Sequence, residues 1–151
     1  DRVVADKIGL EEPSHILYYA LISRYLEVIA DHAENIARRA IDFKTAERKG
    51  GRHAMRDVVS LSELAHNVFL KAMDCVFTGN IDVANNVLEI TEVIGREHER
   101  LMKESPELPV LRTVILELAM IADTGAGIAV IAINKALEKS SKICTLRPAL
   151  T

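Results

Sequence analysis

The chain has 151 residues, of which 49% are hydrophobic, and a formal net charge of −3 at pH 7. A chain of this length and composition can bury a core of its own and is most simply one domain. The small negative charge supplies no overall positive field, so we expect no direct binding of nucleic acid by this chain.

The first predicted helix follows a tail of residues 1–12. It begins at Pro13 with Ser14 as the N-cap and continues to about Lys49. Apolar residues recur along it at the 3-4 spacing that marks a helix face turned toward a core. The expected inward residues are Ile22, Leu26, Ile29, Ala33, Ile36 and Ala40. The opposite face carries Glu27 and Asp31, which we expect to be reached by solvent.

Three further helices are predicted at about 52–77, 81–103 and 110–139. The breaks between the helices fall at Lys49-Gly50-Gly51, at Gly79-Asn80 and between Pro106 and Pro109. No strand-like alternation is present, so the chain is predicted to be an all-α bundle of four long antiparallel helices, followed by a tail at 140–151. The second helix is expected to turn Met55, Val58, Leu61, Ala65, Val68, Ala72 and Val76 inward.

The last predicted helix is apolar enough to raise the question of membrane insertion. The segment from Val114 to Ile133 is long enough to span a bilayer. It contains Glu117 and Asp123, and each acid near the centre of a span costs about 2.5–3.5 kcal/mol on insertion scales. We therefore expect a central helix of the bundle and no membrane span.

The first helix places two carboxylates, Glu27 and Asp31, one helical turn apart. Like charges at this spacing repel by a few tenths of a kcal/mol. Carboxylate oxygens at this spacing can together hold a hard cation, which would explain why the helix accepts the repulsion. The alternative is a solvated charged face on which Arg24 and Arg38, on nearby turns, relieve that repulsion.

The segment Leu26–Ala37, LEVIADHAENIA, resembles the signature helix of the PhoU family, the helical regulators of phosphate uptake. Glu27 and Asp31 fall on the acidic positions of that signature. A looser copy, LAMIADTGAGIA, occupies Leu118–Ala129 and places Asp123 where the first copy has Asp31. In this second copy Ala119 replaces the residue equivalent to Glu27.

The resemblance implies a tandem repeat of three-helix bundles with the acidic signature on the third helix of each repeat. Residues 13–49 would be the third helix of repeat one, and residues 50–139 would be the whole of repeat two. Because the chain starts at Asp1 without an initiator Met, we expect a fragment of a longer protein. Archaeal relatives often carry an AbrB-like DNA-binding domain before the PhoU region.

The function implied by the resemblance is cytoplasmic regulation of phosphate uptake and signalling. Such a regulator would bind Fe, Zn or a similar divalent ion at Glu27, Asp31 and Asp123 and contact a phosphate transporter ATPase or a sensor protein. We also expect a homo-oligomer, since an incomplete first repeat leaves an apolar helix face exposed. The alternative is a helical oligomerisation module of a transcription regulator that binds no metal.

The remaining reactive side chains form no catalytic constellation, so we do not expect an enzyme. Glu97-His98-Glu99 and His66 are interpreted as solvated or boundary positions on helix surfaces. Cys75 and Cys144 fit no metal or redox spacing and are expected to be reduced thiols in the core or the tail.

Overall fold

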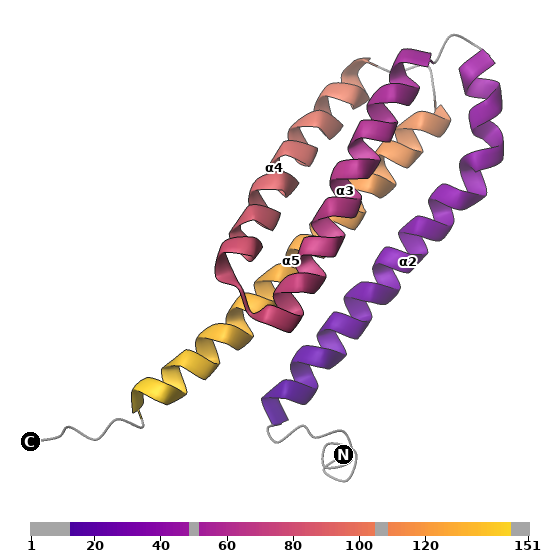
Figure 1. Cartoon of the computed structure of the whole chain (residues 1–151). Helices are drawn as coiled ribbons and strands as arrows, with labels where there is room; N and C mark the ends of the chain where they lie inside the picture. Colours follow the sequence, from indigo (N-terminus) through magenta and orange to yellow (C-terminus); the bar gives the residue numbers. More distant parts are fainter. Residues whose placement is uncertain (1–12, 49–51, 105–108, 146–151) are drawn as a thin grey trace, which may run out of the picture.

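The computed structural model describes residues 13–48, 52–104 and 109–145, which form four α-helices and no strand (Figure 1). The helices are α2 (Pro13–Arg48), α3 (Arg52–Thr78), α4 (Ile81–Glu104) and α5 (Pro109–Thr145). Successive helices run in opposite directions in Figure 1. The prediction of an all-α bundle of four long helices is therefore confirmed.

The helix ends lie where glycine, asparagine and proline predicted them. Gly79 adopts a positive φ of 65°, and its N–H donates to the Cys75 carbonyl at 2.8 Å, which closes α3. The Asn80 side chain then accepts hydrogen bonds from the amides of Asp82 and Val83 at 2.9 and 3.2 Å and caps α4. α5 continues to Thr145, beyond the expected end near Lys139. The division of the chain into repeats stays a prediction.

α5 is the central helix of the bundle. It packs against α2, α3 and α4, and α3 also packs against α4, so α3, α4 and α5 enclose a three-helix core. α2 packs mainly against α5. The most deeply buried side chains are branched aliphatics from α3, α4 and α5, namely Val68, Val87, Ile94, Leu111, Val114, Ile115 and Ile128.

The predicted inward face of α3 is confirmed. Val58, Leu61, Ala65, Val68 and Ala72 are buried, and the two end residues of the pattern are partly buried against the same core.

The inward face of α2 is confirmed in part. Ile22 is buried, and Leu26, Ile29 and Ile36 are half-buried. Ala33 is exposed, contrary to the prediction that it faces the core. The reason is that α2 packs mainly against one helix, α5. A single neighbour covers a narrower stripe of α2 than several neighbours would cover. The side chain of Ala40 lies outside the described residues.

α5 has the length and hydropathy of a membrane-crossing helix over Pro109–Glu138. Within the apolar window of this segment, 56% of the residues are buried in the bundle, since three other helices pack against it. Core helices of this kind satisfy the same length and hydropathy criteria as membrane spans. This packing is what the sequence predicted for a central bundle helix.

The contact between α3 and α5 at Gly125 yields a stability prediction. A Cβ built on Gly125 would lie 2.8 Å from Cγ1 of the fully buried Val68. We expect Gly125→Ala to lower the free energy of unfolding by about 1 kcal/mol, since overpacking costs ~1–3 kcal/mol and outweighs the roughly 1 kcal/mol gain in helix propensity. Urea unfolding followed by circular dichroism measures the change.

Gly95 provides the matched control. No atom lies within 4 Å of a Cβ built there, so Gly95→Ala should stabilise the protein by about 0.5–1 kcal/mol. The double variant Gly125→Ala with Val68→Ala should lose less stability than the two single changes added together. Stabilisation by Gly125→Ala equal to that by Gly95→Ala would show that the two helices do not approach closely here.

Candidate functional site

The acidic pair of α2 lies on the outside of the bundle. Glu27 and Asp31 are both exposed, which confirms their predicted position on the solvent face. Arg24 donates to Glu27 at 3.2 Å, and Arg38 donates twice to Glu34, one turn further on. Exposed ion pairs of this kind contribute little to stability. The arginines therefore reduce the repulsion on this face and leave the carboxylates accessible.

A half-buried hydrogen bond joins α2 and α5 at His32, next to Asp31 in sequence. Nδ1 of His32 lies 2.6 Å from Oε2 of Glu117, and the two side chains are only 17% and 15% exposed. An ionised carboxylate only accepts, so Nδ1 carries the hydrogen and donates it. Sequence reasoning missed this pair, because the partners are 85 residues apart in the chain and no local spacing relates them.

Two further contacts join the other ends of the same helices. The Tyr18 hydroxyl donates to Glu138 at 3.1 Å. Lys135 donates to the Tyr19 hydroxyl at 2.9 Å, with Nζ 4.3 Å from the centre of the ring. Together with His32–Glu117, these contacts fix the antiparallel register of α2 on α5. They thereby determine which side of α2, the one with Glu27 and Asp31, faces solvent.

The third residue predicted to bind metal, Asp123, is exposed on α5. Among the residues that the structure describes, no three or more His, Cys, Asp or Glu side chains are grouped closely enough to hold a metal ion. Glu27 and Asp31 supply oxygen donors that suit a hard cation, but both come from a single helix. The metal assignment of Glu27, Asp31 and Asp123 stays a prediction.

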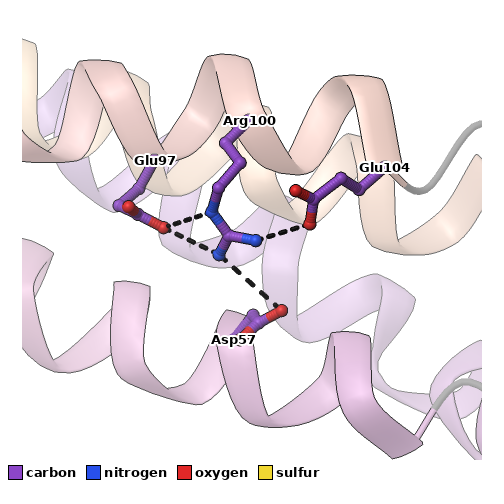
Figure 2. A network of polar contacts seen from close by, with 4 residues as sticks. All are labelled: Asp57, Glu97, Arg100 and Glu104. Carbon is purple, nitrogen blue, oxygen red and sulfur yellow. Dashed lines mark hydrogen bonds and ion pairs between the residues drawn. The ribbon is translucent and has the colours of Figure 1, made fainter.

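A second polar cluster centres on Arg100 of α4 (Figure 2). Its guanidinium donates twice to Glu97, at 3.0 and 2.8 Å, and once to Glu104, at 2.5 Å. Asp57 of α3 lies 3.8 Å from the same guanidinium. The hydrogen bond with Glu97 is the largest cause of a raised Arg100 pKa, so the group stays charged over the whole accessible pH range. Three carboxylates thus share one cation between α3 and α4.

This cluster corrects part of the interpretation of Glu97-His98-Glu99 as a solvated face. Glu97 is half-buried and ion-paired. The Nε2 atom of His98 is buried and has no hydrogen-bond partner among the described residues. The interpretation requires all three residues to be exposed, and of the three only Glu99 is. The reason is that α4 turns this segment toward α3, whose Asp57 extends the ion-pair network.

The other candidate side chains lie where the sequence suggested. His66 is exposed on α3. Cys75 is a free thiol in the core, and burial, followed by the neighbouring charge of Asp74, raises its pKa, which disfavours the reactive thiolate. The side chain of Cys144 lies outside the described residues.

The fold and the acidic helix define a helical-bundle protein that carries its charged signature on the outside of the core. A family model described as the PhoU domain matches residues 2–40, which include Glu27, Asp31 and His32. Over this segment, which is less than half of the chain, the protein is similar to the PhoU domain, the domain of a family of phosphate-uptake regulators. No curated protein and no solved structure matches the chain. The family match ends before α3, so the looser copy in α5 and the tandem-repeat assignment stay predictions.

The His32–Glu117 pair predicts measurable coupling between α2 and α5. Hydrogen bonds to charged groups are worth about 1.5–3 kcal/mol when desolvated, and this pair is partly solvated. A double-mutant cycle with His32→Ala and Glu117→Ala should therefore give a coupling energy of about 1 kcal/mol in urea unfolding. The exposed Arg24–Glu27 pair is the control and should give only about 0.3 kcal/mol. Equal coupling in the two cycles would mean that α2 is not held by this contact.

The Arg100 cluster predicts a charge-dependent loss of stability. Arg100→Met leaves Asp57, Glu97 and Glu104 without their shared cation, so the urea midpoint should fall further than for Arg96→Met. Arg96 is the matched control because, within the part of the chain that the structure describes, it is paired with a single carboxylate, Glu92, at 4.0 Å. The deficit of Arg100→Met should shrink in high salt, and also as the pH falls and the carboxylates take up protons. A deficit independent of both conditions would point to lost packing instead of charge.

Proposed function

We propose that this chain is a regulator of phosphate uptake and signalling that works without catalysis. It binds Fe, Zn or a similar divalent ion on α2 and contacts a phosphate transporter ATPase or a sensor protein in the cytoplasm. One observation carries the proposal: the PhoU family model matches the segment containing Glu27 and Asp31. The exposure of both carboxylates supports it, because an ion or a partner can reach them.

The metal part of the proposal rests on the chemistry of the donors. Glu27 and Asp31 are one turn apart and both are exposed. The ion pair between Glu27 and Arg24 is also exposed, so it leaves the Glu27 carboxylate accessible to an ion. An ion with six or more ligands needs further oxygens from water, from Glu34 or from a second chain. Binding to this chain alone is therefore weak.

Asp123 belongs to the proposal as a separate, second position. Its motif lacks the first acid, because Ala119 takes the place equivalent to Glu27. Ala119 is largely buried, so α5 presents one carboxylate here and α2 presents two. We expect the ion to prefer α2.

The second candidate function is a helical oligomerisation module of a transcription regulator without metal. Two observations favour it. No metal-holding group of three side chains occurs in the described residues, and several large apolar side chains are exposed on the helices. Metal binding to the purified protein separates the two functions.

The metal proposal predicts a loss of binding in a charge-neutral variant. Calorimetric titration of the protein with Fe²⁺ or Zn²⁺ should show weak binding that disappears in Glu27→Gln with Asp31→Asn. Binding should also weaken as the pH falls, because the ligands must be deprotonated. The helix should remain intact or gain a few tenths of a kcal/mol, since the repulsion at i, i+4 is removed.

Glu89→Gln with Glu92→Gln is the matched control. It removes two exposed carboxylates from α4 and changes the net charge by the same amount. Equal titration curves for the wild type and the α2 variant would exclude the site, and equal loss of binding in the α4 variant would mean that binding depends only on general charge.

The regulatory role has its own test. Loss of the gene should raise phosphate uptake in phosphate-rich medium, and unchanged uptake would contradict the role.

A further inference from the structure

A cleft of about 250 Å³, called here the α3–α4 cleft, lies between α3 and α4 beside the Arg100 cluster. Its polar lining consists of Asp57, Ser60, Glu97 and Arg100. Its floor is apolar, since Leu61 and Leu101 also line the cleft and are only 2% exposed. A charged mouth above an apolar floor suits a side chain that has an apolar stem and a charged end.

Asp57 is the charged group of the cleft with the weakest partner. Arg100 gives its three hydrogen bonds to Glu97 and Glu104, the carboxylates before and after it on α4 (Figure 2). The Asp57 carboxylate on α3 lies 3.8 Å from the same guanidinium, too far for a hydrogen bond. Within the described part of the chain no other donor reaches Asp57, although its side chain is only 24% exposed. Asp57 can therefore accept from a donor outside this chain.

The charge of the cluster favours a cation as that donor. Three carboxylates, those of Asp57, Glu97 and Glu104, surround one guanidinium, so two negative charges are not balanced within the cluster. A second cation beside Asp57 would balance one of them. A neutral ligand would leave the excess in place, and an anionic ligand would increase it.

We propose that the α3–α4 cleft is a docking site for an arginine side chain presented by a partner protein. A guanidinium can donate two parallel hydrogen bonds to one carboxylate, here that of Asp57, and it is more weakly hydrated than the ammonium group of lysine. The methylene stem of the arginine packs against Leu61 and Leu101. The docking site goes beyond the proposed function, because it involves neither a metal ion nor the acidic pair of α2.

The rim of the cleft favours a protein segment over free arginine. Val93 lines the cleft and is 38% exposed, and Leu64, which lines it too, is half-buried. An apolar residue next to the arginine in a partner chain would cover these two side chains. Free arginine has no such neighbour, and its own carboxylate would be repelled by Asp57 and Glu97.

The first test titrates ¹⁵N-labelled protein with the tripeptide acetyl-Leu-Arg-Leu-amide and follows the backbone amide signals by NMR. Saturable shifts should appear in residues 57–64 and 93–101. The same tripeptide with citrulline in place of arginine keeps the shape without the charge, and it should bind roughly fivefold more weakly. Free arginine should also bind more weakly than the arginine tripeptide. Equal binding of the two tripeptides would overturn the proposal, and tighter binding of free arginine would assign the cleft to a small metabolite instead.

The second test removes the accepting carboxylate. Asp57→Asn keeps the shape of the side chain and should weaken binding of the arginine tripeptide roughly fivefold. Asp74→Asn is the matched control, because Asp74 is exposed on the same helix and does not line the cleft. This control should bind the tripeptide as the wild type does. Circular dichroism checks that both variants are folded.

Ser60→Arg tests the cleft without removing any ion pair. Ser60 is exposed and lines the cleft, so the new guanidinium should occupy the site beside Asp57 and exclude the tripeptide. Asn67→Arg is the matched control, because it adds the same charge at an exposed position of α3 outside the cleft. Unchanged binding in Asp57→Asn or in Ser60→Arg, or equal losses in the controls, would overturn the proposal. Cleft amide shifts that depend on protein concentration without tripeptide would mean that a second copy supplies the arginine, which would overturn it as well.

Discussion

The close packing of α5 against its neighbours is the constraint on which the rest of this structure depends. At Gly125 the backbone of α5 approaches Val68 of α3 so closely that a Cβ would lie 2.8 Å from a buried methyl group. Small and branched residues on α5 allow three helices to surround it, and the chain contains only 4% aromatic residues that would hold them apart. The positions of the charged side chains of α2 follow from how that helix is placed on α5.

α2 shows the consequence of that arrangement most clearly. It has one principal neighbour, so most of its circumference faces solvent, including Ala33 and both acids of the signature. Polar contacts with α5, chiefly His32–Glu117, hold its register where apolar burial is limited. A helix held in this way can present an acidic surface to an ion or a partner without contributing much to the core.

The two copies of the signature differ in what they offer an ion. The proposed metal position depends on two carboxylates, Glu27 and Asp31, on one turn of α2. The looser copy on α5 presents Asp123 alone, because Ala119 stands at the position equivalent to Glu27 and is largely buried.

The sequence by itself determined the four helices, their breaks, the buried face of α3 and the solvent position of Glu27 and Asp31. Each of these follows from short-range rules, since helical periodicity and the backbone preferences of Gly, Asn and Pro act over a few residues. Only the tertiary structure decided the His32–Glu117 contact, the ion pair between Asp57 and Arg100 and the exposure of Ala33. Those outcomes depend on which helix lies beside which, and packing between segments far apart in the chain has no counterpart in local spacing.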